Sequence, residues 1–125
     1  MSVGVHACKL ADLKAGQTVM IFGAGPVGLL AGAVAKASGA VRITMVDINQ
    51  TRLDFAKNYV ASEIVLAERE IPQGLSSIDF SKSFSQKLLE SGIEQADVVL
   101  ECSGAETCIQ TGIYVSVNNY VYELF

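Results

Sequence analysis

The stretch Thr18-Val-Met-Ile-Phe-Gly-Ala-Gly-Pro-Val-Gly28 decides the fold of this 125-residue chain. Its first five residues are apolar or β-branched, a pattern that predicts a short buried strand. Glycine at positions 23, 25 and 28 follows, and Pro26 suits the first turn of a helix. A strand, a tight turn and a helix therefore succeed one another within this stretch.

The rest of the chain continues the alternation. We expect helices over 27–38, 50–59, 84–91 and 105–112, strands over 18–22, 41–46, 63–67 and 97–102, and a long polar connection over 68–81. The expected strands are almost continuously apolar, which is typical of a parallel sheet that is buried on both faces. The predicted fold class is α/β, a parallel sheet in the order 3-2-1-4 with helices on both faces.

The glycines match the G-x-G-x-x-G pattern, and each has a mechanical task. Gly23 makes the tight turn, Gly25 lets the backbone approach a pyrophosphate, and Gly28 permits close packing of helix against strand. The pyrophosphate would lie at the N-terminus of the helix that Pro26 and Val27 begin, where unpaired N–H groups favour an anion. Because the motif follows a strand and opens a helix, it predicts dinucleotide binding in a Rossmann-type sheet. The alternative is a turn with a purely structural role.

An acidic residue at the end of the second strand completes this pattern. Asp47 would accept hydrogen bonds from the ribose hydroxyls, and its charge would repel a 2′-phosphate, so NAD is expected rather than NADP. Arg52 lies in the first turn of the next helix. It could stack on the adenine, which we favour, pair with Asp47, or be solvated.

Composition excludes several classes of protein. Half of the residues are hydrophobic and the formal net charge is −4, so the chain is expected to fold rather than to be disordered. The nine Lys and Arg residues form no basic cluster, and neither nucleic acid nor a membrane surface is an expected partner. The apolar run 15–35 is interrupted by glycines and by Pro26, which favours a soluble protein. Cysteines at positions 8, 102 and 108 show no C-x-x-C spacing, which favours reduced thiols and a cytoplasmic location.

Several motifs carry a family resemblance. They are Ser2-Val-Gly-Val-His-Ala-Cys8, Leu13-Lys-Ala-Gly-Gln-Thr-Val19, Phe22-Gly-Ala-Gly-Pro-Val-Gly-Leu-Leu30, Val46-Asp-Ile48, Arg52-Leu53 and Val99-Leu-Glu-Cys-Ser-Gly-Ala-Glu106. Together they resemble the coenzyme domain of zinc-dependent medium-chain alcohol dehydrogenases, most closely the sorbitol/xylitol (polyol) dehydrogenase group. The Gly-Ala-Gly-Pro turn and the Glu-Cys-Ser-Gly turn are the specific parts.

The resemblance implies that the parent enzyme oxidises a polyol to a ketose and delivers hydride to NAD. It implies contacts of Val27, Asp47 and Arg52 with the dinucleotide, and it places the turn at Cys102 and Ser103 beside the adenosine. The family's catalytic zinc is bound by Cys, His and Glu of a separate catalytic domain, so the zinc ligands are expected outside this chain. A polyol would bind only together with that domain.

No catalytic or metal-binding residue is expected in the chain itself. His6 and Cys8, two residues apart on an expected helix, point in different directions and would not share a metal. Cys102 and Cys108 lie in different elements without a histidine partner. Glu101, at the end of the fourth strand, is expected to orient the loop that follows it rather than to act as an acid or base.

The C-terminal end departs from the resemblance. We expect an incomplete Rossmann domain over 1–114 and a divergent tail over 115–125, which places the later strands of the sheet in question. The runs 113–117 and 120–122 flank Asn118-Asn119, a pair that favours a type I′ hairpin. An aromatic tail beside an uncovered fourth strand would promote self-association. Fraying of the tail into a disordered end is the alternative.

The sequence therefore predicts the NAD(H)-binding portion of a polyol dehydrogenase, inactive as this fragment. Two other readings stay open. One is a standalone dinucleotide-binding module without catalysis, and the other is a non-functional truncated product.

Overall fold

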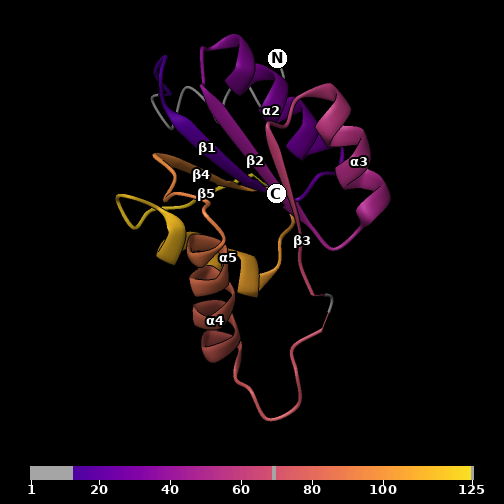
Figure 1. The fold of residues 1–125 in the computed structure, drawn as a ribbon, viewed down its shortest axis with the longest axis vertical. Helices are drawn as coiled ribbons and strands as arrows, with labels where there is room; N and C mark the ends of the chain where they lie inside the picture. The colour runs from indigo at the N-terminus through magenta and orange to yellow at the C-terminus, as the bar shows by residue number, and fades with distance from the viewer. Residues whose placement is uncertain (1–12, 69, 125) are drawn as a thin grey trace.

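The computed structural model describes residues 13–68 and 70–124. In chain order these residues form β1 (Thr18–Phe22), α2 (Pro26–Ala37), β2 (Arg42–Asp47), α3 (Gln50–Tyr59), β3 (Glu63–Leu66), α4 (Ser77–Glu90), β4 (Val98–Glu101), α5 (Glu106–Val115) and β5 (Tyr122–Glu123). The strands make one parallel sheet in the order β3-β2-β1-β4-β5 (Figure 1). The predicted α/β class and the order 3-2-1-4 are confirmed, and a fifth strand extends the sheet.

Helices cover the two faces of the sheet, with α2 and α3 on one side and α4 and α5 on the other (Figure 1). Because successive side chains of a strand point to opposite faces, β1 divides its residues between two cores. Val19 and Ile21 pack with α2 and α3, whereas Met20 and Phe22 pack on the α4 and α5 side. This sandwich fixes β1 at the centre of the sheet.

Helix α4 begins earlier than the sequence suggested. The prediction placed its start at Phe84 and a connection through Ser81, but the helix runs from Ser77 to Glu90. The Ser76 hydroxyl accepts a hydrogen bond from the backbone N–H of Asp79 at 3.1 Å and caps the helix. The buried Ser81 hydroxyl donates a hydrogen bond to the Ser77 carbonyl at 2.8 Å. The helix therefore accommodates serines that the sequence analysis assigned to the connection.

The predicted hairpin at the C-terminal end is wrong. Residues 113–115 continue α5, where Val115 is fully buried, and β5 pairs in parallel with β4. Asn119 has a φ of 57°, the left-handed conformation that asparagine was expected to tolerate. It lies in the connection between α5 and β5, and not in a hairpin turn. The edge of β4 that was expected to be uncovered is therefore paired, and the self-association inferred from it stays an untested prediction.

Within the described ranges, no helix has both the length and the apolar character needed to cross a bilayer.

Candidate functional site

A cavity of about 400 Å³ opens at the carboxyl-terminal edge of β1, β2 and β4. In open parallel α/β sheets, ligands bind in the crevice at this edge, at the point where the strand order reverses, here between β1 and β4. The cavity is lined by Gly23, Gly25, Pro26, Val27, Val46, Asp47, Ile48, Arg52, Ala67, Cys102, Ser103, Ala105 and Cys108. Every residue predicted for the cofactor site except Gly28 is in this set, so segments far apart in the sequence meet around one cavity.

Close backbone contacts explain why the turn after β1 needs glycine. Gly23 has a φ of +104°, and a Cβ there would lie 3.0 Å from the backbone carbon of Cys102. A Cβ on Gly28 would lie 1.8 Å from the carbonyl oxygen of Gly23, which no side chain allows. Gly28 thus lies behind the turn and sets its packing instead of lining the cavity.

Gly25 differs from these two glycines because its Cβ position is open. The nearest atom to that position is Nη1 of Arg52, at 3.8 Å, and the φ of −78° suits any residue. Nothing in the fold therefore demands glycine here. A glycine at this position leaves room for a ligand against the backbone.

The N-terminus of α2 offers donors to such a ligand. Gly25 caps the helix without a side-chain hydrogen bond, and its carbonyl accepts a hydrogen bond from the Leu29 N–H at 2.9 Å. Within the described residues, the N–H groups of Gly25, Val27 and Gly28 have no acceptor. Unpaired N–H groups at a helix N-terminus form a site for phosphate or carboxylate.

Asp47 joins the end of β2 to this turn. Its Oδ2 accepts a hydrogen bond from the Ala24 N–H at 2.7 Å, and its Oδ1 accepts one from the Asn49 N–H at 2.9 Å. The carboxylate therefore fixes the glycine turn and the start of α3 in addition to facing the cavity. The sequence suggested only its contact with a ribose, because spacing along the chain does not reveal a bond to Ala24.

Arg52 lies on the first turn of α3, with an exposed side chain at the mouth of the cavity. The Asn49 side chain accepts a hydrogen bond from the backbone N–H of Arg52 at 3.1 Å. No ion pair with Asp47 is formed, so one of the three predicted roles for this arginine is not observed. Its guanidinium instead approaches Gly25, where it adds positive charge beside the helix N-terminus.

The loop after β4 is held by a buried carboxylate. Glu101 is fully buried, and it accepts hydrogen bonds from the backbone N–H groups of Ser103 at 2.7 Å and Gly104 at 2.8 Å, and from the Ser103 hydroxyl. A buried charge needs such partners to offset its lost hydration. The expectation that Glu101 orients this loop agrees with these contacts, and they hold Cys102 and Ser103 at the cavity wall.

Cys108 faces the same cavity from the first turns of α5, a position that the sequence did not indicate. Burial raises the pKa of its thiol; a hydrogen bond with Ser103 opposes this, and the negative charges of Glu101 and Asp47 raise the pKa further. The thiol is therefore neutral at physiological pH and is not an activated nucleophile. Ile48 and Ala67 were also missed, because apolar residues after a strand carry no distinctive signal.

The described residues contain no group of three or more His, Cys, Asp or Glu side chains that could bind a metal. His6 and Cys8 lie outside the described residues. The part of the chain that the structure describes therefore does not fit the family's zinc site.

Known proteins are similar to this chain in sequence and in architecture. Residues 26–117 match the family described as zinc-binding dehydrogenase. D-xylulose reductase A of Aspergillus niger is 45% identical over 115 residues, and D-xylulose reductase of Saccharomyces cerevisiae is 44% identical over 115 residues. In both cases the match covers 92% of this chain and 30% of the relative.

Solved structures of dehydrogenases contain the same fold. Alcohol dehydrogenase TADH from Thermus sp. ATN1 superposes with a TM-score of 0.74 at 28% identity, covering 97% of this chain and 32% of that one. Galactitol-1-phosphate dehydrogenase from Escherichia coli gives 0.69 at 28% identity, covering 91% and 30%. The chain thus spans about 30% of the length of these relatives. With a family match over most of its length and a parallel sheet of dehydrogenase type, this chain belongs to the zinc-binding dehydrogenase family.

Proposed function

We propose that the chain is the NAD(H)-binding portion of a polyol dehydrogenase that interconverts a polyol such as xylitol and its ketose. The observation that carries the proposal is the cavity itself, with the open face of Gly25, the unpaired N–H groups of α2 and the carboxylate of Asp47 around it. The similarity to the fungal D-xylulose reductases supports the substrate class.

Each part of this cavity has a role toward the dinucleotide. The start of α2 would bind the pyrophosphate, and Arg52, which lies beside Gly25, would add charge to that contact. Asp47 would accept from the adenosine ribose, and the wall at Cys102, Ser103 and Cys108 would lie against the adenine. The dinucleotide would accept the hydride in polyol oxidation and return it in ketose reduction, and this chain would position the dinucleotide.

The first test replaces Gly25 with alanine. Because the Cβ position is open and φ is negative, Gly25→Ala should fold with only a small decrease in the thermal unfolding midpoint, the cost of alanine at a helix N-cap, while the methyl group obstructs the pyrophosphate. We expect NADH affinity, measured by calorimetric titration, to fall by about tenfold or more, on the order of 1.4 kcal/mol. Unchanged affinity in the folded variant would count against a dinucleotide site at this turn.

The second test concerns the choice of NAD over NADP. The unmodified chain should bind NADH more tightly than NADPH, because Asp47 repels a 2′-phosphate. Asp47→Ala removes bonds worth about 1–3 kcal/mol and also loosens the glycine turn, since Ala24 loses its acceptor. A looser turn weakens the binding of both nucleotides alike. The diagnostic quantity is therefore the ratio of NADH affinity to NADPH affinity, which should decrease in the variant. An unchanged ratio would contradict the role of Asp47.

A further inference from the structure

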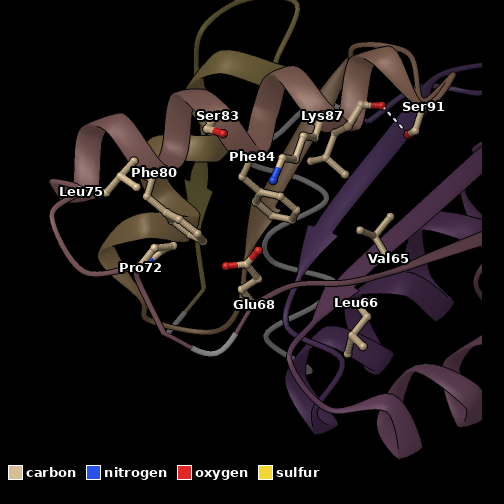
Figure 2. Close-up of a pocket in the computed structure, with 11 residues that line it drawn as sticks. Val65, Leu66, Glu68, Pro72, Leu75, Phe80, Ser83, Phe84, Lys87 and Ser91 are labelled. Atoms are coloured by element: carbon tan, nitrogen blue, oxygen red, sulfur yellow. Dashed lines mark hydrogen bonds between the residues drawn. The ribbon is translucent and has the colours of Figure 1, made fainter.

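A second cavity of about 360 Å³ lies over β3, away from the dinucleotide cavity, and the two share no lining residue. It is bounded by the end of β3, the connection that follows it and one face of α4 (Figure 2). Its volume lies within the range of about 300–1,000 Å³ that is usual for small-molecule sites. The proposed function gives this cavity no task.

The interior of the β3 cavity is apolar and aromatic. Val65 and Leu66 come from the strand, and Phe80 and Phe84 come from α4, their rings stacked with centroids 6.2 Å apart and planes 21° apart. Leu66 retains 55% of its surface exposed and Leu75 retains 41%, so the described chain leaves apolar surface in contact with water. An apolar group that binds here would remove this surface from water, and this burial favours its binding.

Two opposite charges border the cavity. Figure 2 shows Glu68, on the connection, and Lys87, on α4, with their side chains directed toward the cavity from different walls. Within the described residues neither side chain forms an ion pair. A ligand with only a carboxylate would be attracted by Lys87 and repelled by Glu68, and a ligand with only an ammonium would meet the reverse. A ligand that carries both charges satisfies both walls.

We propose that this β3 cavity binds a free α-amino acid with a large apolar side chain. The side chain lies against Phe84 and the neighbouring apolar wall, the carboxylate pairs with Lys87, and the ammonium pairs with Glu68. The two cavities have no residue in common, so an amino acid bound here would not occupy the dinucleotide cavity.

The test titrates the 125-residue chain with L-phenylalanine and follows backbone amide shifts by NMR. Three matched probes accompany it: N-acetyl-L-phenylalanine lacks the ammonium, L-phenylalaninamide lacks the carboxylate, and glycine lacks the apolar side chain. We expect L-phenylalanine to bind several-fold more tightly than any of them, with shifts confined to the end of β3, the connection and α4. Shifts confined to the glycine turn, or no shifts, would overturn the proposal.

Charge variants sharpen this test. Glu68→Gln and Lys87→Met should each weaken L-phenylalanine binding by about threefold to fivefold, the range for partly exposed charge pairs. Glu70→Gln and Lys82→Met are matched controls, because these exposed residues lie on the same segments without lining the cavity, and they should bind normally. Equal binding of N-acetyl-L-phenylalanine, together with insensitivity to Glu68→Gln, would show a simple carboxylate site and refute the zwitterion.

Discussion

Single residues in this chain serve the fold and the candidate site together. Asp47 faces the dinucleotide cavity and also accepts hydrogen bonds from Ala24 and Asn49. Glu101 is buried, yet its three bonds to residues 103 and 104 shape the opposite wall of that cavity. A change at either carboxylate should therefore alter binding and stability together. Gly25 is the exception, and for that reason it gives the cleaner test.

Cys108 gives a pH-dependent prediction at this scale. Burial raises the pKa of its thiol in the folded state, so the folded chain disfavours the thiolate relative to the unfolded chain. The free energy of unfolding is therefore undiminished below the unfolded pKa of about 8.5, and it decreases as the pH rises through the folded pKa. Chemical denaturation at pH 7.5, 8.5 and 9.5 should show this decline.

Cys108→Ala serves as the control for that decline. Its free energy of unfolding should fall less over the same pH interval, because the titrating thiol is gone. Parallel curves for the two proteins would mean that the alkaline loss of stability comes from other groups.

At the scale of elements, the C-terminal segment decides how the sheet ends. Strand β5 has only two residues, Tyr122 and Glu123, but it pairs with β4, and Leu124 beyond it is buried. Val121 packs with the core on the α4 and α5 side. A short edge strand of this kind protects a longer apolar strand from pairing with another chain.

Removing residues 120–125 should therefore uncover β4 and promote self-association. Sedimentation velocity at several concentrations should show a larger weight-average coefficient for the shortened chain than for the whole one. If the shortened chain stays monomeric at the highest concentration, β5 has no protective role. If the whole chain already associates, the association uses a surface other than the edge of β4.

At the scale of the whole molecule, the chain contains one dinucleotide-type sheet and spans about 30% of its curated relatives. The described residues line the proposed cofactor cavity but contain no group of metal-binding side chains. We therefore expect this chain to bind NADH without catalysing the oxidation of a polyol. NADH at 100 times its dissociation constant should raise the free energy of unfolding by about 2.7 kcal/mol.

Turnover should be undetectable under the same conditions. The purified 125-residue chain with NAD⁺, added zinc and xylitol or sorbitol should produce no NADH absorbance above a protein-free control. A known full-length polyol dehydrogenase is the positive control for the assay. NADH formation that depends on this chain would refute the assignment of a binding portion without catalysis.

The sequence by itself determined the local structure around the glycine turn. The strand 18–22, the turn with Gly23 and Gly28, the following helix and the strand ending at Asp47 could all be predicted, because apolar periodicity and backbone sterics act within a few residues. The parallel order followed from the same alternation of strand and helix. Eight of the predicted cofactor-site residues line one cavity for this reason.

Only the tertiary structure decided the rest. Residues 113–115 continue α5, with Val115 buried, although their β-branched residues indicated a strand. Strand β5 pairs in parallel with the edge of β4, although the two asparagines indicated a hairpin. Cys108 reaches the dinucleotide cavity, and Glu68 and Lys87 border the β3 cavity, through packing between distant segments. Contacts of this kind depend on burial against the assembled sheet, and no spacing along the chain encodes them.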